Sequence, residues 1–95
     1  VVAQNLAPTA ANVSVGGRVL TASGGGISRA QVSITNQNGE TRWAITNSFG
    51  FYHFDEIRAG ETYVINVRHK VYQFDSQVIT VSEDIRNADF IAESK

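Results

Sequence analysis

The fold is decided by residues 46–67, TNSFGFYHFDEIRAGETYVINV. Apolar residues recur at regular positions on both sides of the Ala59-Gly60 corner, at Tyr52, Phe54, Ile57, Tyr63, Ile65 and Val67. A period of two residues that breaks at glycine indicates β-strands joined by tight turns. The stretch therefore predicts an all-β scaffold, and it contains no motif of catalytic residues.

The same pattern extends outward over the chain and predicts seven strands. We expect them at residues 13–20, 30–35, 41–46, 51–54, 62–68, 77–81 and 87–92. Turn signals such as Asn36-Gln37-Asn38-Gly39 separate them at intervals of roughly 8 to 12 residues, which is typical of a β-sandwich. No segment has helical spacing over ten or more residues. The predicted fold is a seven-stranded, antiparallel, Greek-key β-sandwich.

Residues 1–11 precede this pattern, and we expect an extended tail or linker there, with the domain proper over residues 12–95. The tail contains the only proline, Pro8, which a central strand would not tolerate. Eleven residues extended at about 3.3 Å each reach roughly 35 Å, enough to add as a donor strand to the edge of a sandwich. Val1, Val2 and Leu6 would then be interface residues, and repeated donation from copy to copy would produce a filament.

Composition limits the classes of function. The chain has 95 residues, 42% of them hydrophobic and 18% charged, which is the composition of one globular domain. Its net charge is −1 and its basic residues are scattered from Arg18 to Lys95, so we expect no nucleic-acid partner and no membrane insertion. The absence of cysteine excludes disulfides and thiolate catalysis. The absence of methionine suggests an excised, processed or trimmed segment.

Several spaced motifs resemble those of the carboxypeptidase regulatory-like domains. They are Gly17-Arg18-Val19, the segment Gly26 to Ile34, the pattern Thr46-Asn47-x-x-Gly50-x-Tyr52-x-Phe54-x-x-Ile57-x-x-Gly60-x-x-Tyr63-x-Ile65-x-Val67, and Asp89-Phe90. The resemblance covers residues 13–92 and implies a transthyretin-like or immunoglobulin-like sandwich. It also implies an accessory module without an active site, on a secreted or cell-surface protein of a bacterium.

One chemistry of related modules is not expected here. Collagen-adhesin B-type modules, which are related to the family that this chain resembles, form an isopeptide bond between a lysine of the first strand and an Asn or Asp of the last. The only lysines of this chain are Lys70 and Lys95, and the cation of the first predicted strand is Arg18. The chain departs from that pattern, so no isopeptide bond is expected.

The remaining polar motifs do not predict an enzyme or a cofactor. His53 and His69 have no third residue at ligand spacing and are expected to be surface histidines rather than zinc ligands. Asp55-Glu56 and Glu83-Asp84 fit solvated turns, with a weak calcium site as the alternative. No serine lies in a Gly-x-Ser-x-Gly elbow. Asn12-Val13-Ser14 has the form of a glycosylation sequon.

A set of apolar residues is expected to face outward. In the third predicted strand we expect Ala44 and Thr46 to point into the core, so that Trp43 and Ile45 lie on the other face. Phe51 and Ile91 are similarly out of phase with their inward neighbours, so we expect one sheet to display these four apolar residues together. Such a patch marks an interface, unless the register is misassigned or the tail covers it.

Three functions remain open from the sequence. The first is a non-catalytic extracellular module that binds other protein domains. The second is a homo-oligomeric form of it, a filament subunit joined through the tail and the edge strands. The third is a carbohydrate- or surface-binding accessory domain of a larger secreted enzyme or adhesin, which would stack glycans on Trp43, Phe51, Tyr52 and Tyr72.

Overall fold

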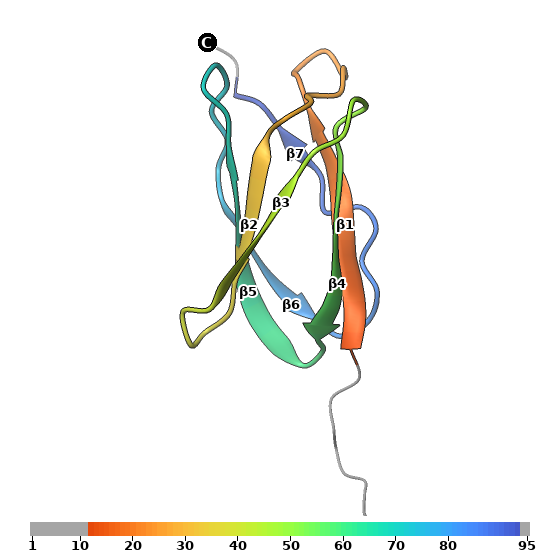
Figure 1. Cartoon of the computed structure of the whole chain (residues 1–95), viewed down its shortest axis with the longest axis vertical. Coiled ribbons are helices and arrows are strands. Elements are labelled where there is room, and N and C mark those ends of the chain that lie inside the picture. Colours follow the sequence, from red (N-terminus) through yellow and green to blue (C-terminus); the bar gives the residue numbers. More distant parts are fainter. Residues whose placement is uncertain (1–11, 94–95) are drawn as a thin grey trace, which may run out of the picture.

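A computed structural model describes residues 12–93 and is all-β over this range (Figure 1). Seven strands form two facing sheets, which confirms the predicted fold class. The strands are β1 (Asn12–Leu20), β2 (Gln31–Thr35), β3 (Thr41–Ile45), β4 (Phe51–Arg58), β5 (Glu61–Arg68), β6 (Gln77–Val81) and β7 (Phe90–Ile91). The predicted tail, with Val1, Val2 and Leu6, lies outside the described residues.

Two strands differ in length from the prediction by more than one residue. β4 continues to Arg58 because Ile57 still pairs with Val13, on the far side of a bulge in the β1–β4 ladder. Glu56 lies within this irregular part with a φ of 57°, so the carboxylates that suggested a turn mark a bulge instead. β7 comprises only Phe90–Ile91, because most of the segment before it bonds to β1 without forming a regular ladder.

The two sheets have the orders β4-β1-β7 and β3-β2-β5-β6. β2 pairs with both β3 and β5, although β4 of the other sheet lies between these two in sequence, so the topology is a Greek key. The prediction of a wholly antiparallel sandwich is wrong at one pair, since β7 runs parallel to β1. After β6 the chain crosses to the other sheet and follows β1 in the same direction (Figure 1).

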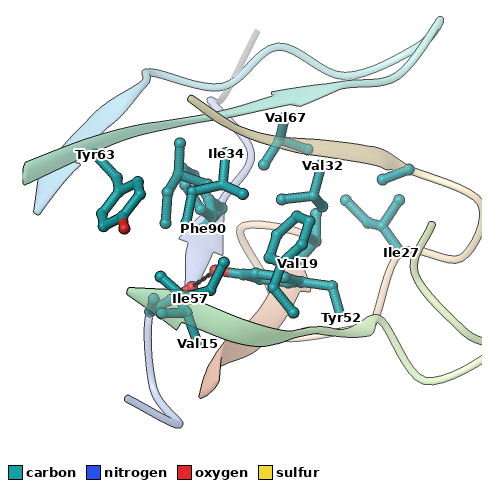
Figure 2. Packing of buried hydrophobic residues seen from close by; sticks show 14 of the residues in the cluster. Val15, Val19, Ile27, Val32, Ile34, Tyr52, Ile57, Tyr63, Val67 and Phe90 are labelled. Carbon is teal, nitrogen blue, oxygen red and sulfur yellow. Dashed lines mark hydrogen bonds between the residues drawn. The ribbon is translucent and has the colours of Figure 1, made fainter. Parts of the chain in front are cut away.

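The core lies between the inward faces of both sheets (Figure 2). The largest fully buried side chains are those of Ile65, Val15, Val19, Val32 and Val81. Tyr52 packs on the inward face of the three-stranded sheet: its ring lies edge-on to that of Phe54 in the same strand, at 6.0 Å between centroids, and 6.3 Å from that of Phe90 in β7. Its hydroxyl donates a hydrogen bond to the carbonyl of Ala88, so this buried polar group has a partner.

The segment before β7 approaches β1 so closely that one glycine is required. A Cβ on Gly17 would overlap the backbone of Ala88. Two carboxylates of the same segment also accept hydrogen bonds from backbone amides of β1, Asp84 from Ser14 and Asp89 from Arg18, both at 2.9 Å. The segment thus covers one long side of β1, while β4 covers the other.

Side chains of the four-stranded sheet bridge to the opposite sheet along both sides of the sandwich. On one side the Arg42 guanidinium of β3 donates to the carbonyls of Asp55, at 2.6 Å, and Glu56, at 3.3 Å, in β4. On the other, Nε2 of Gln77 in β6 donates to the carbonyl of Asp89 at 2.8 Å. These contacts fix the two layers and leave the outer faces free.

Candidate interaction surface

The outward residues of β3 include the largest apolar groups on the outer face of the four-stranded sheet. Trp43 is 53% exposed and Ile45 is 63% exposed, while Thr46 is buried and Ala44 packs against the core. The predicted register of this strand is therefore confirmed. On β2 the residue opposite Trp43 is Ser33, which also points outward but is almost fully buried beneath its larger neighbours.

Strand register extends this face across all four strands. We call it the Trp43 face, and its members are Thr41, Trp43, Ile45, Gln31, Ser33, Thr35, Thr62, Val64, Asn66, Arg68, Val78 and Thr80. Arg68 is its only charged member. Val78 is 69% exposed at the opposite edge from Trp43. A whole sheet face with so little charge resembles the centre of a protein interface, where charged residues are depleted and Trp is enriched.

Phe51 and Ile91 do not belong to this face, so the predicted single patch is wrong. Both are exposed as expected, at 49% and 61%, but they lie on β4 and β7 of the three-stranded sheet. The reason is that the chain crosses between sheets at residues 46–50, before Phe51, and again between β6 and β7, before Ile91. The Arg18 guanidinium also stacks over the Phe51 ring at 4.7 Å, which gives that face a cationic character.

The set of residues proposed for glycan stacking is not assembled either. Tyr52 is buried in the core, and Phe51 and Trp43 lie on opposite faces of the sandwich. Tyr72 is half-buried, with its ring 5.3 Å from that of His69. Trp43 is therefore the one member of the set that combines large exposure with a place on a flat sheet face.

A basic groove adjoins the Trp43 face at the end of the sandwich where β5 ends. It is lined by Ser28, Arg29, Gln31, Arg68, His69 and Lys70. Sequence analysis missed this cluster because Arg29 is far in sequence from Arg68 and Lys70; the pairing of Gln31 with Arg68 brings them together. Two carboxylates nearby, Asp75 and Glu93, interact with each other: a hydrogen bond to Asp75 raises the pKa of Glu93 above its usual range.

The carboxylate pairs approach one another at the opposite end of the sandwich. Asp55, Glu56 and Asp84 line one shallow pocket beside Asn12. Asp84 accepts the Ser14 amide, and Asp55 lies 2.6 Å from Nε2 of His53. Within residues 12–93 no group of three or more His, Asp or Glu side chains is placed to hold a metal ion. Asp55 and Asp84 each have a structural contact of their own.

The other polar candidates stay separate in space. His53 lies opposite Gly16 on the outer face of the three-stranded sheet. His69 follows β5, where its Nδ1 accepts the Val71 amide at 3.1 Å. Asn12 is exposed at the first position of β1. Residues 12–93 form no helix, and hence none that could cross a membrane.

Comparison with known proteins agrees with the fold. No curated protein matched the sequence. Among solved structures, the Bacillus anthracis TIE protein is similar to 85% of this chain with a TM-score of 0.66 and 14% sequence identity. The matched region is only 16% of that longer protein. The carboxypeptidase regulatory-like family matches residues 14–91. The chain therefore belongs to the carboxypeptidase regulatory-like domain family, whose members are generally non-catalytic.

Proposed function

We propose that this chain is a non-catalytic extracellular module that acts through protein–protein contacts made by the Trp43 face. The observation that carries the proposal is the exposure of Trp43 and Ile45 on a sheet face with a single charge. Apolar groups of this size in water cost free energy that a partner surface would remove. The family supports the coarser part, a non-catalytic domain.

The surroundings of the face favour a partner with acidic groups. Ile45, Gln31 and Arg68 lie side by side across β3, β2 and β5. Arg68 also lines the basic groove with Arg29 and Lys70. An apolar centre bordered by cations is complementary to an apolar patch bordered by carboxylates, and such charges increase the rate of association. Binding should therefore weaken as salt concentration rises.

Photo-crosslinking tests the proposal in the intact parent protein on its own cells. A benzophenone amino acid replaces Trp43, and a matched variant carries it at Phe51, which is similarly exposed on the opposite face. We expect a protein adduct of defined mass from position 43 and none from position 51. Equal adducts from both positions, or none from position 43, would contradict the proposal.

Carbohydrate binding is the alternative, and Trp43 is the observation that still favours it. Its indole presents an aromatic surface on a flat sheet, which suits stacking on a sugar ring. A glycan array probed with the full chain, beside Trp43→Ala, separates the two functions. If the full chain binds a specific glycan and Trp43→Ala does not, then a glycan, and not a protein, is the ligand of the Trp43 face.

Filament formation through residues 1–11 stays a prediction. Electron microscopy of the full chain beside a variant that lacks these residues tests it. Regular filaments that require the tail would support donor-strand assembly. If both samples contain only particles of single-domain size, the prediction of filaments is wrong.

A further inference from the structure

A sandwich can add a further strand only at an edge strand of one of its sheets. Three of the four edge strands here have features that hinder such pairing. β7 has only two residues. β4 has two carbonyls occupied by the Arg42 guanidinium, and it bulges at Glu56. β3 carries Arg42 itself as an inward-pointing charge. Short edge strands, bulges and inward charges are the features by which natural sheets prevent edge-to-edge pairing.

β6 has none of these features. Its sequence, Gln77-Val78-Ile79-Thr80-Val81, contains no charge, no proline and no glycine, and four of its five residues are β-branched. Val78 is the most exposed large apolar side chain on the described chain. Apart from the ladder with β5, residues 77–81 make one backbone hydrogen bond within residues 12–93, from the Gly60 amide to the Val81 carbonyl.

An edge strand with one partner directs alternate amides and carbonyls away from the sheet. On β6 this row faces outward next to Val78 and Thr80, and no side chain between residues 12 and 93 hydrogen-bonds to the backbone of residues 78–80. Such a row is a template for another extended strand. The uncharged sequence means that two copies of β6 would meet without charge repulsion.

We propose that β6 pairs antiparallel with β6 of a second copy of this chain, joining two four-stranded sheets into one continuous sheet. A register centred on Ile79 places Val78 opposite Thr80 of the second copy. β-branched residues pack well on the surface of a sheet, and two-fold symmetry is the commonest symmetry of homo-oligomers. The axis is perpendicular to the sheet, so both Trp43 faces lie on the same side and form one surface.

The pairing uses the β6 edge, where Val78 and Thr80 are the only members of the Trp43 face that take part. Trp43 and Ile45 are not involved, so the pairing stands or fails independently of the proposed partner binding. Sedimentation velocity of the full chain, from micromolar to millimolar concentration, measures it. We expect a monomer–dimer equilibrium that Val78→Lys weakens by at least about tenfold, because each lysine would replace a β-branched residue opposite Thr80 and the two lysines, as diagonal neighbours across the new ladder, would repel each other. The matched control is Ile45→Lys, equally outward and exposed on β3, which should leave the equilibrium unchanged.

A second measurement tests the register and does not depend on affinity. The chain has no cysteine, so introduced thiols report only on their own positions. A mixture of Val78→Cys and Thr80→Cys chains should form a disulfide-linked dimer faster than either variant alone. Both sites are exposed, and thermal unfolding of each variant verifies that it folds.

Three outcomes would overturn the proposal. The first is a wild-type chain that remains monomeric at all concentrations. The second is an equal effect of Val78→Lys and Ile45→Lys, which would move the contact away from β6. The third is loss of the dimer when residues 1–11 are removed, which would make the tail, and not β6 of the second copy, the strand that occupies this edge.

Discussion

The two sheets of this sandwich differ in how many of their backbone polar groups are hydrogen-bonded at the edges and in how much apolar surface their outer faces expose. In the three-stranded sheet β1 is flanked on both sides, and Asp84 and Asp89 accept backbone amides that the irregular segment before β7 leaves unpaired. Its outer face carries Arg18 over Phe51 and the His53–Asp55 contact. The four-stranded sheet instead presents the Trp43 face with one charge and an unprotected edge at β6.

This difference indicates a division of roles between the sheets. The three-stranded sheet is held by many specific contacts with distant parts of the sequence, so changes there should affect stability. The outer face of the four-stranded sheet has large side chains that contribute little to the core, so changes there should affect association instead. Substitutions in matched pairs, one in each region, can break or sharpen this contrast.

The largest effect is expected for Tyr52→Ala compared with Trp43→Ala. Tyr52 is 4% exposed and contacts Phe54, Phe90 and Ala88. Removing a buried aromatic ring should lower the free energy of unfolding by about 3–5 kcal/mol. Trp43→Ala removes a side chain that is half in solvent and should change it by about 0.5 kcal/mol. Urea denaturation followed by circular dichroism measures both.

Tyr52→Phe is the control for that comparison, because it keeps the ring and removes only the hydroxyl. A loss of about 1–2 kcal/mol would assign the remainder of the Tyr52→Ala effect to packing. If Trp43→Ala destabilised the domain as much as Tyr52→Ala does, the Trp43 face would be a structural element and the contrast between the sheets would not hold.

The next effect tests the close approach of β1 to the segment before β7. Gly17→Ala places a methyl group against the backbone of Ala88, which can move only if the hydrogen bonds around it change. We expect a loss of about 1–3 kcal/mol, as for other overpacked sites. Gly25→Ala, in a loop with only Thr21 in contact range, should be nearly neutral. Thermal unfolding of both variants measures the difference, and equal melting temperatures would exclude the close packing.

Much of this architecture could be predicted because its signals are local. The alternation around the Ala59-Gly60 corner predicted β4 and β5, and the phase of Ala44 predicted the exposure of Trp43 and Ile45. These inferences need only the period of two residues and the positions of turns. The same reasoning assigned Asp55-Glu56 to a turn, because a bulge and a turn favour similar residues and only the pairing of Ile57 with Val13 distinguishes them.

The features that were not predicted from the sequence depend on which strands are neighbours in the sheets. The basic groove requires Gln31 to pair with Arg68, thirty-seven positions away along the chain. The separation of Phe51 from Trp43 requires the crossing at residues 46–50, which local patterns do not reveal. The protection of β3 and β4 by Arg42, and its absence at β6, likewise follow from sheet order. Edge and surface properties are therefore the last to be inferred from a single sequence.

A smaller effect is expected at high pH in the three-stranded sheet. Burial, and secondly the charge of Asp89, raise the pKa of Tyr52 above its usual value. The folded domain thus holds this proton more tightly than the unfolded chain, so stability is unaffected below the ordinary tyrosine pKa of about 10 and falls as pH rises above it. The expected slope approaches about 1.4 kcal/mol per pH unit. Tyr52→Phe should reduce this slope, and an unchanged slope would contradict the assignment.

The smallest effect concerns the fluorescence of Trp43, which reports on the outer face of the four-stranded sheet. Trp43 is the only tryptophan of the chain and is 53% exposed, so its emission should resemble that of tryptophan in water and should shift little when urea unfolds the domain. Acrylamide should quench it almost as well before unfolding as after. The indole contributes little to the core. A small change in emission on unfolding is therefore expected if the Trp43 face is uncovered in the isolated chain. Blue-shifted, protected emission from the isolated chain would instead show that the face is already covered, and dilution of the chain beside the variant without residues 1–11 would then identify whether a second copy or the tail covers it.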